Sequence, residues 1–318
     1  MQKRVLGRTG IEVSEISFGG VEIGIPYGIG IQSQADMPTL VEATALLQAA
    51  RDGGINFFDT ARAYGRSEEI IGQALSSRRA EVIICSKCSH FPRREGQLPG
   101  DGEMAAIIRR SLQQSLDALR TDYIDVYMLH SASADIVEHP AVMECFQELK
   151  QQGVIRATGA STYSVAESER AIASGAWDVL QISFNLLDQR QAMIFNQAEA
   201  AGVGLVIRSV LLKGILSDKG RSLHPALAAI ENHRDRYQEI LAETGWTLSA
   251  LATKFALSFA QVASVLVGID RMAYLQQALA TANGQYLDAA ALAGVQALKF
   301  PDPAFIDLPH WDRMGWLK

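Results

Sequence analysis

The chain has 318 residues, of which 48% are hydrophobic and 20% are charged. That composition can bury a large core, which excludes a disordered or fibrous protein. The 29 Lys and Arg against 35 Asp and Glu give a formal net charge of -6, so nucleic acid and anionic membrane surfaces, which bind basic patches, are not expected partners.

Neither a membrane span nor a secreted scaffold is expected. The longest apolar stretch, residues 255–269, is interrupted by polar residues and is shorter than the roughly 20 residues that a spanning helix needs. Glu12 and Glu15 precede any apolar run that would form a signal peptide. Three cysteines and no Asn-x-Ser/Thr site argue against a disulfide-stapled secreted protein, so we expect a cytoplasmic location.

The chain begins with a predicted β-hairpin and continues as alternating strands and helices. KRVLGRTGIEVSE predicts two short strands around an Arg8-Thr9-Gly10 turn, a hairpin that caps one end of the fold. Eight runs rich in Val, Ile and Phe then predict strands at residues 16–20, 55–60, 81–87, 123–130, 156–161, 179–185, 202–209 and 263–268. Segments with a helical period lie between or after them, at residues 39–51, 67–75, 104–119, 142–151, 165–174, 191–201, 248–259 and 272–281.

This alternation predicts an α/β fold, a single (β/α)8 TIM barrel domain over residues 1–318, because no linker-like change in composition divides the chain. Four segments exceed a minimal loop: residues 21–38, 89–103, 213–236 and a C-terminal tail of about 283–318. Three of them follow a strand, so we expect long loops at the C-terminal face, where such barrels hold their active sites. Glycines 24, 28 and 30 lack the spacing of a dinucleotide fingerprint and predict a flexible loop over the pocket.

Nearly every predicted strand ends in a polar residue. These residues are Asp59, Lys87, His130, Ser161, Gln181 with Asn185, and Arg208. Any one of them alone is explained equally well by contact with solvent. Because the carboxyl ends of the strands of a parallel barrel meet at one face, the set predicts one pocket built from distant parts of the sequence.

Three of these residues, with Tyr64 from the segment after Asp59, form a candidate general-acid site. A tyrosine with a pKa near 10 is a poor acid at neutral pH, but an adjacent ammonium stabilises its phenolate, and Lys87 is placed to act on Tyr64 in this way. A half-buried lysine needs an anion, for which Asp59 is the candidate, and His130 is a candidate hydrogen-bond donor to a substrate carbonyl. This chemistry suits hydride reduction of an aldehyde or ketone, in which a proton is added to oxygen.

The same segments resemble the aldo-keto reductase family of NAD(P)H-dependent (β/α)8 barrels. INFFDTARAYGRSEEIIGQAL is similar to the family's Asp/Tyr signature, EVIICSK to the strand that ends in its lysine, and DYIDVYMLH to the strand that ends in its histidine. The resemblance covers roughly residues 3–282. It implies that Asp59, Tyr64, Lys87 and His130 are the catalytic tetrad, with Tyr64 as the proton donor.

The resemblance also implies a nicotinamide site. GVIRATGASTYS is similar to the segment whose Ser-Asn pair binds the carboxamide, here Ser161-Thr162, so the second contact is altered. Gln181 corresponds to the carboxamide-binding glutamine. In IRSVLLKGIL, Arg208 replaces the aromatic residue that stacks on the nicotinamide, and its charge bears either on redox poise or on recognition of an anionic group. Further cofactor contacts implied by this segment are Ser209, Leu211 and Lys213.

VLVGIDRMAYLQQALATAN is similar to the family segment that binds the adenosine phosphate. The residues implied to contact the cofactor are Gly268, Ile269, Asp270, Arg271, Tyr274 and Gln277. Arg271 favours NADPH over NADH, because a cation pairs with a 2′-phosphate, and the usual cofactor preference of the family agrees. Local positive charge on a chain of negative net charge is expected at Arg271, Arg208 and Lys213.

The long loops predict a polar substrate pocket. The candidate substrate residues are Glu22, Tyr27, Arg93, Arg94, His310, Trp311 and Arg313. A polar and aromatic set of this kind suits a sugar aldehyde or another small polar carbonyl better than a steroid or lipid. Arg93 and Arg94 are also explained as part of a solvated loop.

Alternatives remain at this stage. Lys87 also suits a Schiff-base aldolase. The resemblance extends to cofactor-binding potassium-channel beta subunits that act as sensors on a partner. An NAD-dependent sugar dehydrogenase would run the same chemistry in the oxidative direction. The complete tetrad favours an enzyme.

No metal site is expected, because Cys85-Ser-Lys-Cys88 ends a strand and no His cluster exists. A homo-oligomer is compatible with the sequence but is not specified by it.

Overall fold

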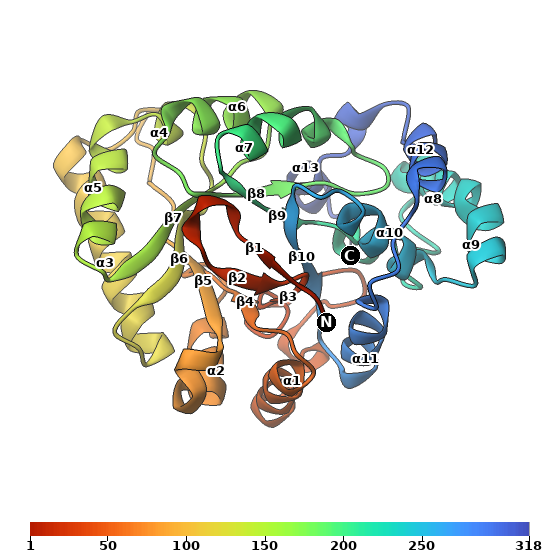
Figure 1. Ribbon diagram of the computed structural model, residues 1–318, viewed down its shortest axis with the longest axis horizontal. Coiled ribbons are helices and arrows are strands. Elements are labelled where there is room, and N and C mark those ends of the chain that lie inside the picture. The colour runs from red at the N-terminus through yellow and green to blue at the C-terminus, as the bar shows by residue number, and fades with distance from the viewer. Residues whose placement is uncertain (318) are drawn as a thin grey trace.

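A computed structural model describes residues 1–317. Eight parallel strands close into a barrel in the order β10-β3-β4-β5-β6-β7-β8-β9. Helices surround the barrel, and a hairpin lies across one of its ends (Figure 1). The predicted (β/α)8 TIM barrel is therefore confirmed, while the assignment of the whole chain to one domain stays a prediction.

Each barrel strand begins and ends within two residues of its predicted run. The strands are β3 (Ile16–Gly19), β4 (Phe57–Asp59), β5 (Ile83–Lys87), β6 (Ile124–Leu129), β7 (Ile155–Ser161), β8 (Val179–Ser183), β9 (Gly204–Arg208) and β10 (Val262–Gly268). Their parallel pairing sets Gly19 opposite Asp59, and Ser161 opposite Gln181. The polar strand ends consequently lie at one edge of the barrel, as predicted.

The predicted helices are also present. They are α1 (Leu40–Asp52), α2 (Ser67–Leu75), α3 (Asp101–Leu119), α5 (Pro140–Gln151), α6 (Val165–Ser174), α7 (Phe195–Ala200), α10 (Leu248–Leu257) and α11 (Met272–Thr281). The helix predicted for residues 191–201 begins as a 3-10 turn at Arg190 and becomes α-helical only at Phe195. Further short helices are α4 (Ala134–Val137) after β6, α8 (Ala228–His233) and α9 (Gln238–Thr244) between β9 and α10, and α12 (Ala289–Ala297) and α13 (Leu308–Arg313) in the tail.

The N-terminal hairpin plugs one end of the barrel. Its strands, β1 (Lys3–Val5) and β2 (Glu12–Ser14), pair antiparallel. The hairpin side chains Leu6, Ile11 and Val13 are buried against the apolar barrel interior. The Arg4 guanidinium donates hydrogen bonds to carbonyl oxygens between the end of α10 and the start of β10, including that of Val262 at 2.8 Å. The hairpin therefore caps the N-terminal end, and the polar pocket has to open at the other.

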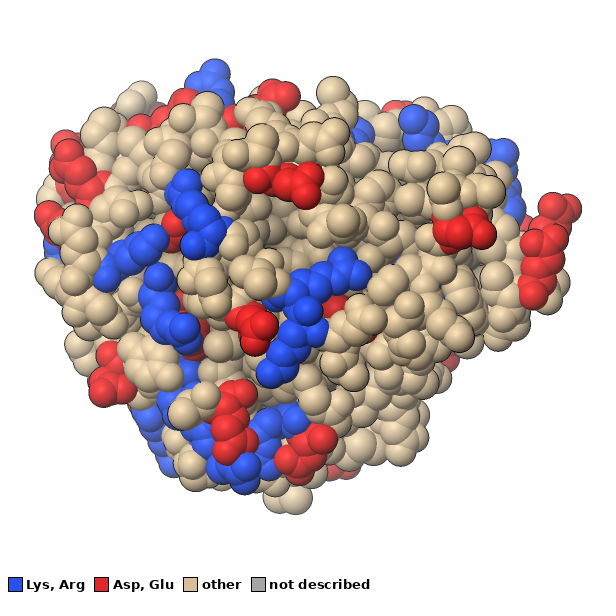
Figure 2. Space-filling model, in the orientation of Figure 1, with Lys and Arg blue, Asp and Glu red and all other residues tan. Residues whose placement is uncertain are grey.

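The face that carries the hairpin has acidic and basic side chains interspersed, with no continuous basic patch in this view (Figure 2). Within residues 1–317, no helix combines the length and the apolar character needed to cross a bilayer.

Candidate active site

A buried ion pair lies at the base of the pocket. Lys87, at the end of β5, is fully buried, and its Nζ lies 2.8 and 2.7 Å from the two carboxylate oxygens of Asp59 at the end of β4. The carbonyl oxygen of Thr60 accepts a third hydrogen bond at 3.0 Å. Burial acts to lower the pKa of Lys87, but the Asp59 carboxylate, through its charge and hydrogen bonds, acts together with Tyr64 and Cys85 to hold that pKa above its usual range. Lys87 is therefore a fixed cation.

Tyr64 and His130 lie above this pair. The Tyr64 ring centre is 4.9 Å from Lys87 Nζ and 5.3 Å from the centre of the His130 ring, which it meets edge-on. Tyr64 lies in the tight turn before α2, and a Cβ on Gly24 would lie 1.9 Å from the Tyr64 carbonyl oxygen. Only glycine at position 24 therefore permits this close approach of the two loops.

Two opposing effects act on the pKa of Tyr64. Burial raises the pKa of Tyr64, and the Lys87 charge opposes this rise without reversing it. The Lys87 ammonium thus acts in the predicted direction, but desolvation of the phenolate is the larger effect. Burial and the nearby cations lower the pKa of His130 to about 2, so its imidazole is neutral.

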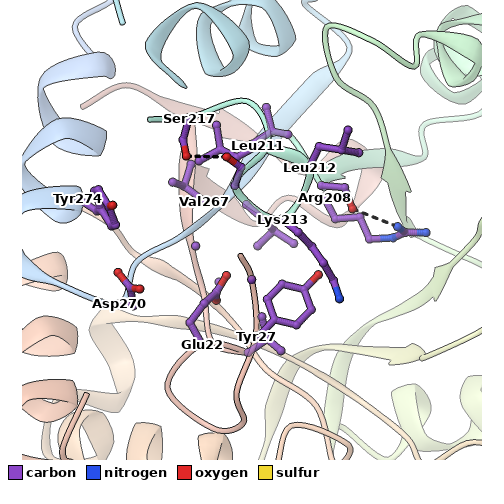
Figure 3. A pocket seen from close by; sticks show the side chains of 18 of the residues that line it. Glu22, Tyr27, Arg208, Leu211, Leu212, Lys213, Ser217, Val267, Asp270 and Tyr274 are labelled. Atoms are coloured by element: carbon purple, nitrogen blue, oxygen red, sulfur yellow. Dashed lines mark hydrogen bonds between the residues drawn. The ribbon is translucent and has the colours of Figure 1, made fainter. Parts of the chain in front are cut away.

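A cavity of about 360 Å³ extends from these residues along the barrel mouth to α11. Among the lining residues, Asp270 and Tyr274 lie on one side and Arg208 on the other, with Glu22 and Tyr27 between them (Figure 3). Predicted cofactor residues that line the cavity are Gln181, Arg208, Ser209, Leu211, Lys213, Gly268, Asp270, Tyr274 and Gln277. Its volume falls within the range of roughly 300–1,000 Å³ that is usual for ligand cavities.

Around the predicted nicotinamide site, side chains hold one another in place. Gln181 donates a hydrogen bond of 2.8 Å to Asp59. The hydroxyl of Thr162 lies 2.7 Å from that of Ser168 and is buried, and neither Ser161 nor Thr162 lines the cavity. The Arg208 guanidinium donates to the Thr162 carbonyl oxygen at 2.9 Å and lies 4.2 Å from the ring centre of Tyr163.

At the far end, Asp270 is paired with two cations. Its carboxylate lies 3.3 Å from Lys219 Nζ and 3.2 Å from Arg271 Nε. Lys219 lines the cavity, whereas Arg271 lies outside its lining with its guanidinium 5.1 Å from the ring centre of Tyr274. Ile269 is fully buried in the apolar core.

Only two of the predicted substrate residues, Glu22 and Tyr27, line the cavity. Arg93 and Arg94 form exposed ion pairs with acidic residues of nearby segments. Trp311 is completely buried in the tail, where it packs against Phe305. The other two, His310 and Arg313, lie beside it on α13 and outside the cavity lining.

Several lining residues were not identified from the sequence. Tyr163 follows the Ser161-Thr162 pair, and Lys219 lies in a loop without a periodic pattern. Leu308 and Asp312 of the tail also line the cavity. His90 stacks on His130 with 4.6 Å between ring centres. Only the proximity of Tyr163 to a predicted cofactor residue offered a signal.

The cavity fits a dinucleotide. Three of its buried polar atoms, Glu22 Oε2, His130 Nδ1 and Arg208 Nε, have no hydrogen-bond partner within residues 1–317, and such atoms are normally satisfied by a ligand or water. Polar groups occur at both ends of the elongated space, with apolar walls such as Leu211 and Val267 between them. A parallel barrel with a buried Lys–Asp pair beneath a tyrosine and a neutral histidine defines a carbonyl oxidoreductase that binds a nicotinamide cofactor.

Comparison with known proteins agrees with this class. The model of the Aldo/keto reductase family matches residues 15–299. L-galactose dehydrogenase of Arabidopsis thaliana is 26% identical, with 95% of each chain covered. The NADH-specific methylglyoxal reductase of Escherichia coli is 28% identical, with 92% of this chain and 96% of the relative covered.

Among solved structures, an aldo-keto reductase from Bacillus halodurans in its holo form superimposes with a TM-score of 0.77. It is 26% identical, with 94% of this chain and 96% of that chain covered. The chain belongs to the aldo/keto reductase family and is an NAD(P)H-dependent oxidoreductase.

Proposed function

We propose that the protein reduces the carbonyl group of a small polar substrate, of sugar type, with Tyr64 as the proton donor. The observation that carries the proposal is the buried Lys87–Asp59 pair beneath Tyr64 and His130 at one end of the cavity. Polar groups near this end, including Arg208 and Tyr27, suit a hydroxylated substrate.

A nicotinamide cofactor bound in this cavity would supply a hydride to the carbonyl carbon. The Tyr64 hydroxyl donates its proton to the carbonyl oxygen as the C=O π bond breaks. The Lys87 charge, 4.9 Å from the Tyr64 ring centre, stabilises the phenolate that remains until solvent returns a proton. Neutral His130 has one ring N–H, which orients the carbonyl oxygen.

We propose NADPH as the preferred cofactor. Lys219 and Arg271 provide positive charge at the end of the cavity away from the tetrad. A 2′-phosphate at this end would form a charge-assisted hydrogen bond with Lys219, which lines the cavity, and the adjacent Arg271 charge would add to the attraction.

One observation favours a second candidate, an NAD-dependent sugar dehydrogenase. Asp270 already binds both Lys219 and Arg271, so its carboxylate competes with a 2′-phosphate and is able to accept a hydrogen bond from a ribose 2′-hydroxyl. The names of two relatives, an L-galactose dehydrogenase and an NADH-specific reductase, support the same alternative.

The test is an assay of NADPH and NADH oxidation with aldoses, dialdoses and simple aldehydes, together with NADP⁺ and NAD⁺ reduction by sugars. Tyr64→Phe is expected to lower kcat by about 10²–10⁴-fold, the usual contribution of a general acid, while the cofactor Kd stays unchanged. Tyr123→Phe is the matched control, because Tyr123 lies against Arg79 away from the cavity.

Each outcome of these assays distinguishes between the candidate functions. Unchanged turnover in Tyr64→Phe would contradict the role of proton donor, and turnover of only aromatic or long-chain aldehydes would contradict a sugar-type substrate. Faster turnover with NAD⁺ and a sugar than with NADPH would replace the first candidate by the second. Borohydride trapping of a substrate adduct on Lys87 would instead indicate an aldolase.

A further inference from the structure

Glu22 lies on the floor of the cavity, where the ends of β3 and β10 adjoin. A Cβ on Gly268 would lie 2.1 Å from Glu22 Oε1, and one on Gly19 would lie 3.6 Å from Oε2. The carboxyl group is therefore packed over two strand-end glycines. A larger residue at position 268 would displace the carboxyl group from this place.

The Glu22 carboxyl group has little in its surroundings to stabilise a negative charge. Oε2 is buried and has no hydrogen-bond partner within residues 1–317. The titratable groups that face it are Asp270 after β10, Lys219 after β9, Asp59 on β4 and Tyr27 on its own loop. The one cation among them, Lys219, is bound to Asp270. Burial raises the pKa of Glu22 to about 8, with Asp270 and Asp59 acting in the same direction; the backbone amide of Glu22 itself and the Lys219 charge oppose this rise without reversing it.

Glu22 also lies between the two ends of the cavity. The close-up places it between Asp270 and Tyr274 on one side and Arg208 on the other (Figure 3), and its charge interacts with both Asp59 and Asp270. A dinucleotide that reaches from the tetrad to α11 passes this point with its central diphosphate. A carboxylate here would repel that anion, whereas a carboxylic acid would donate a hydrogen bond to it.

We propose that Glu22 binds the cofactor as an uncharged carboxylic acid whose O–H donates a hydrogen bond to the diphosphate. This inference rests on the proposed function, because it requires the dinucleotide to lie in this cavity. It makes cofactor binding dependent on a proton held by the protein. Loss of the proton removes the donor and introduces like-charge repulsion.

The test measures the Kd of NADH and of NADPH between pH 7 and pH 9.5 at constant ionic strength, by quenching of tryptophan fluorescence. If only protonated Glu22 permits binding, the wild-type Kd rises tenfold per pH unit above about 8, or about 30-fold by pH 9.5. Glu22→Gln keeps a donor at every pH, so its Kd should match wild type at pH 7 within about threefold and stay flat. Glu239→Gln, which removes an exposed carboxylate on α9, should retain the wild-type rise.

ADP-ribose, which has the diphosphate but no nicotinamide, should show the same rise. A flat ADP-ribose profile would overturn the assignment of the contact to the diphosphate. A flat wild-type profile, or an unchanged rise in Glu22→Gln, would overturn the inference alone, and the latter result would assign the pH dependence to a different group. Failure of wild type to bind either cofactor at pH 7 would overturn the proposed function and the inference with it.

Discussion

At the scale of single residues, the contacts of Lys87 decide between two chemistries. Its Nζ has three acceptors within 3.0 Å, as many as an ammonium has protons. A Schiff-base lysine must be neutral to attack a carbonyl, and a lowered pKa is the usual means to this. Here the surrounding acidic groups, Asp59 first among them, together outweigh burial and hold the pKa of Lys87 above its usual range, which favours an electrostatic role over a nucleophilic one.

Lys87→Met should lower the free energy of unfolding by about 3–5 kcal/mol, because it leaves the Asp59 carboxylate buried without its cation. Asp59→Asn combined with Lys87→Met should cost less than Lys87→Met alone, since no charge is then buried. Urea denaturation of both variants measures the difference. Equal losses would mean that packing of the lysine stem, and not charge, accounts for the cost.

At the scale of elements, the C-terminal tail contributes to the cavity wall. Helix α13 supplies Leu308 and Asp312 to the lining, and Asp312 pairs with Lys213 of the loop after β9. Lys213 Nζ also lies 4.3 Å from the ring centre of Tyr27 on the loop after β3. The tail and two long loops thus meet over the cavity, with the buried Trp311 anchoring α13.

Trp311→Ala should detach α13 from the core. We then expect the cofactor to dissociate about tenfold faster, which corresponds to a free-energy barrier to dissociation that is lower by roughly 1.4 kcal/mol. Stopped-flow measurement of NADPH or NADH dissociation provides the rate. Met314→Ala, on the same tail but exposed, should leave it unchanged. A raised KM for substrate without faster cofactor release would instead support the substrate role that the sequence predicted for Trp311.

At the scale of the whole molecule, the two ends of the barrel have different tasks. Apolar side chains of the hairpin fill the N-terminal end, and the polar strand ends form the cavity at the other. Stability and chemistry are therefore separated along the barrel axis, as in other barrels of this fold.

Leu6→Ala should lower the free energy of unfolding by about 2–5 kcal/mol, because it leaves a cavity in the plugged end. At 25 °C, kcat/KM should stay within about twofold of wild type, since the catalytic face is untouched. Val5→Ala, in the same strand region but 55% exposed, should change stability by less than about 0.5 kcal/mol. A loss of activity in folded Leu6→Ala would show that the two ends are coupled.

The strand-end residues could be predicted because their positions follow from local patterns. Asp59, Lys87 and His130 each end a short apolar run, and parallel pairing brings such ends together whatever the loops do. Tyr64 was found through its sequence motif. Lys219 and Asp312 could not be predicted, because they lie in segments without hydrophobic periodicity.

The sequence by itself determined the order of strands and helices, the barrel they close into and the polar groups on its rim. Side-chain periods of two and 3.6 residues are local properties, and eight repeated βα units close in one way. Tertiary structure alone decided which loops meet, as when Lys213 contacts Asp312 across 99 positions. It alone also decided how far each carboxyl group is buried and which charges surround it. Burial raises the pKa of Glu22 to about 8, because desolvation depends on every element packed around a group and not on its neighbours in sequence.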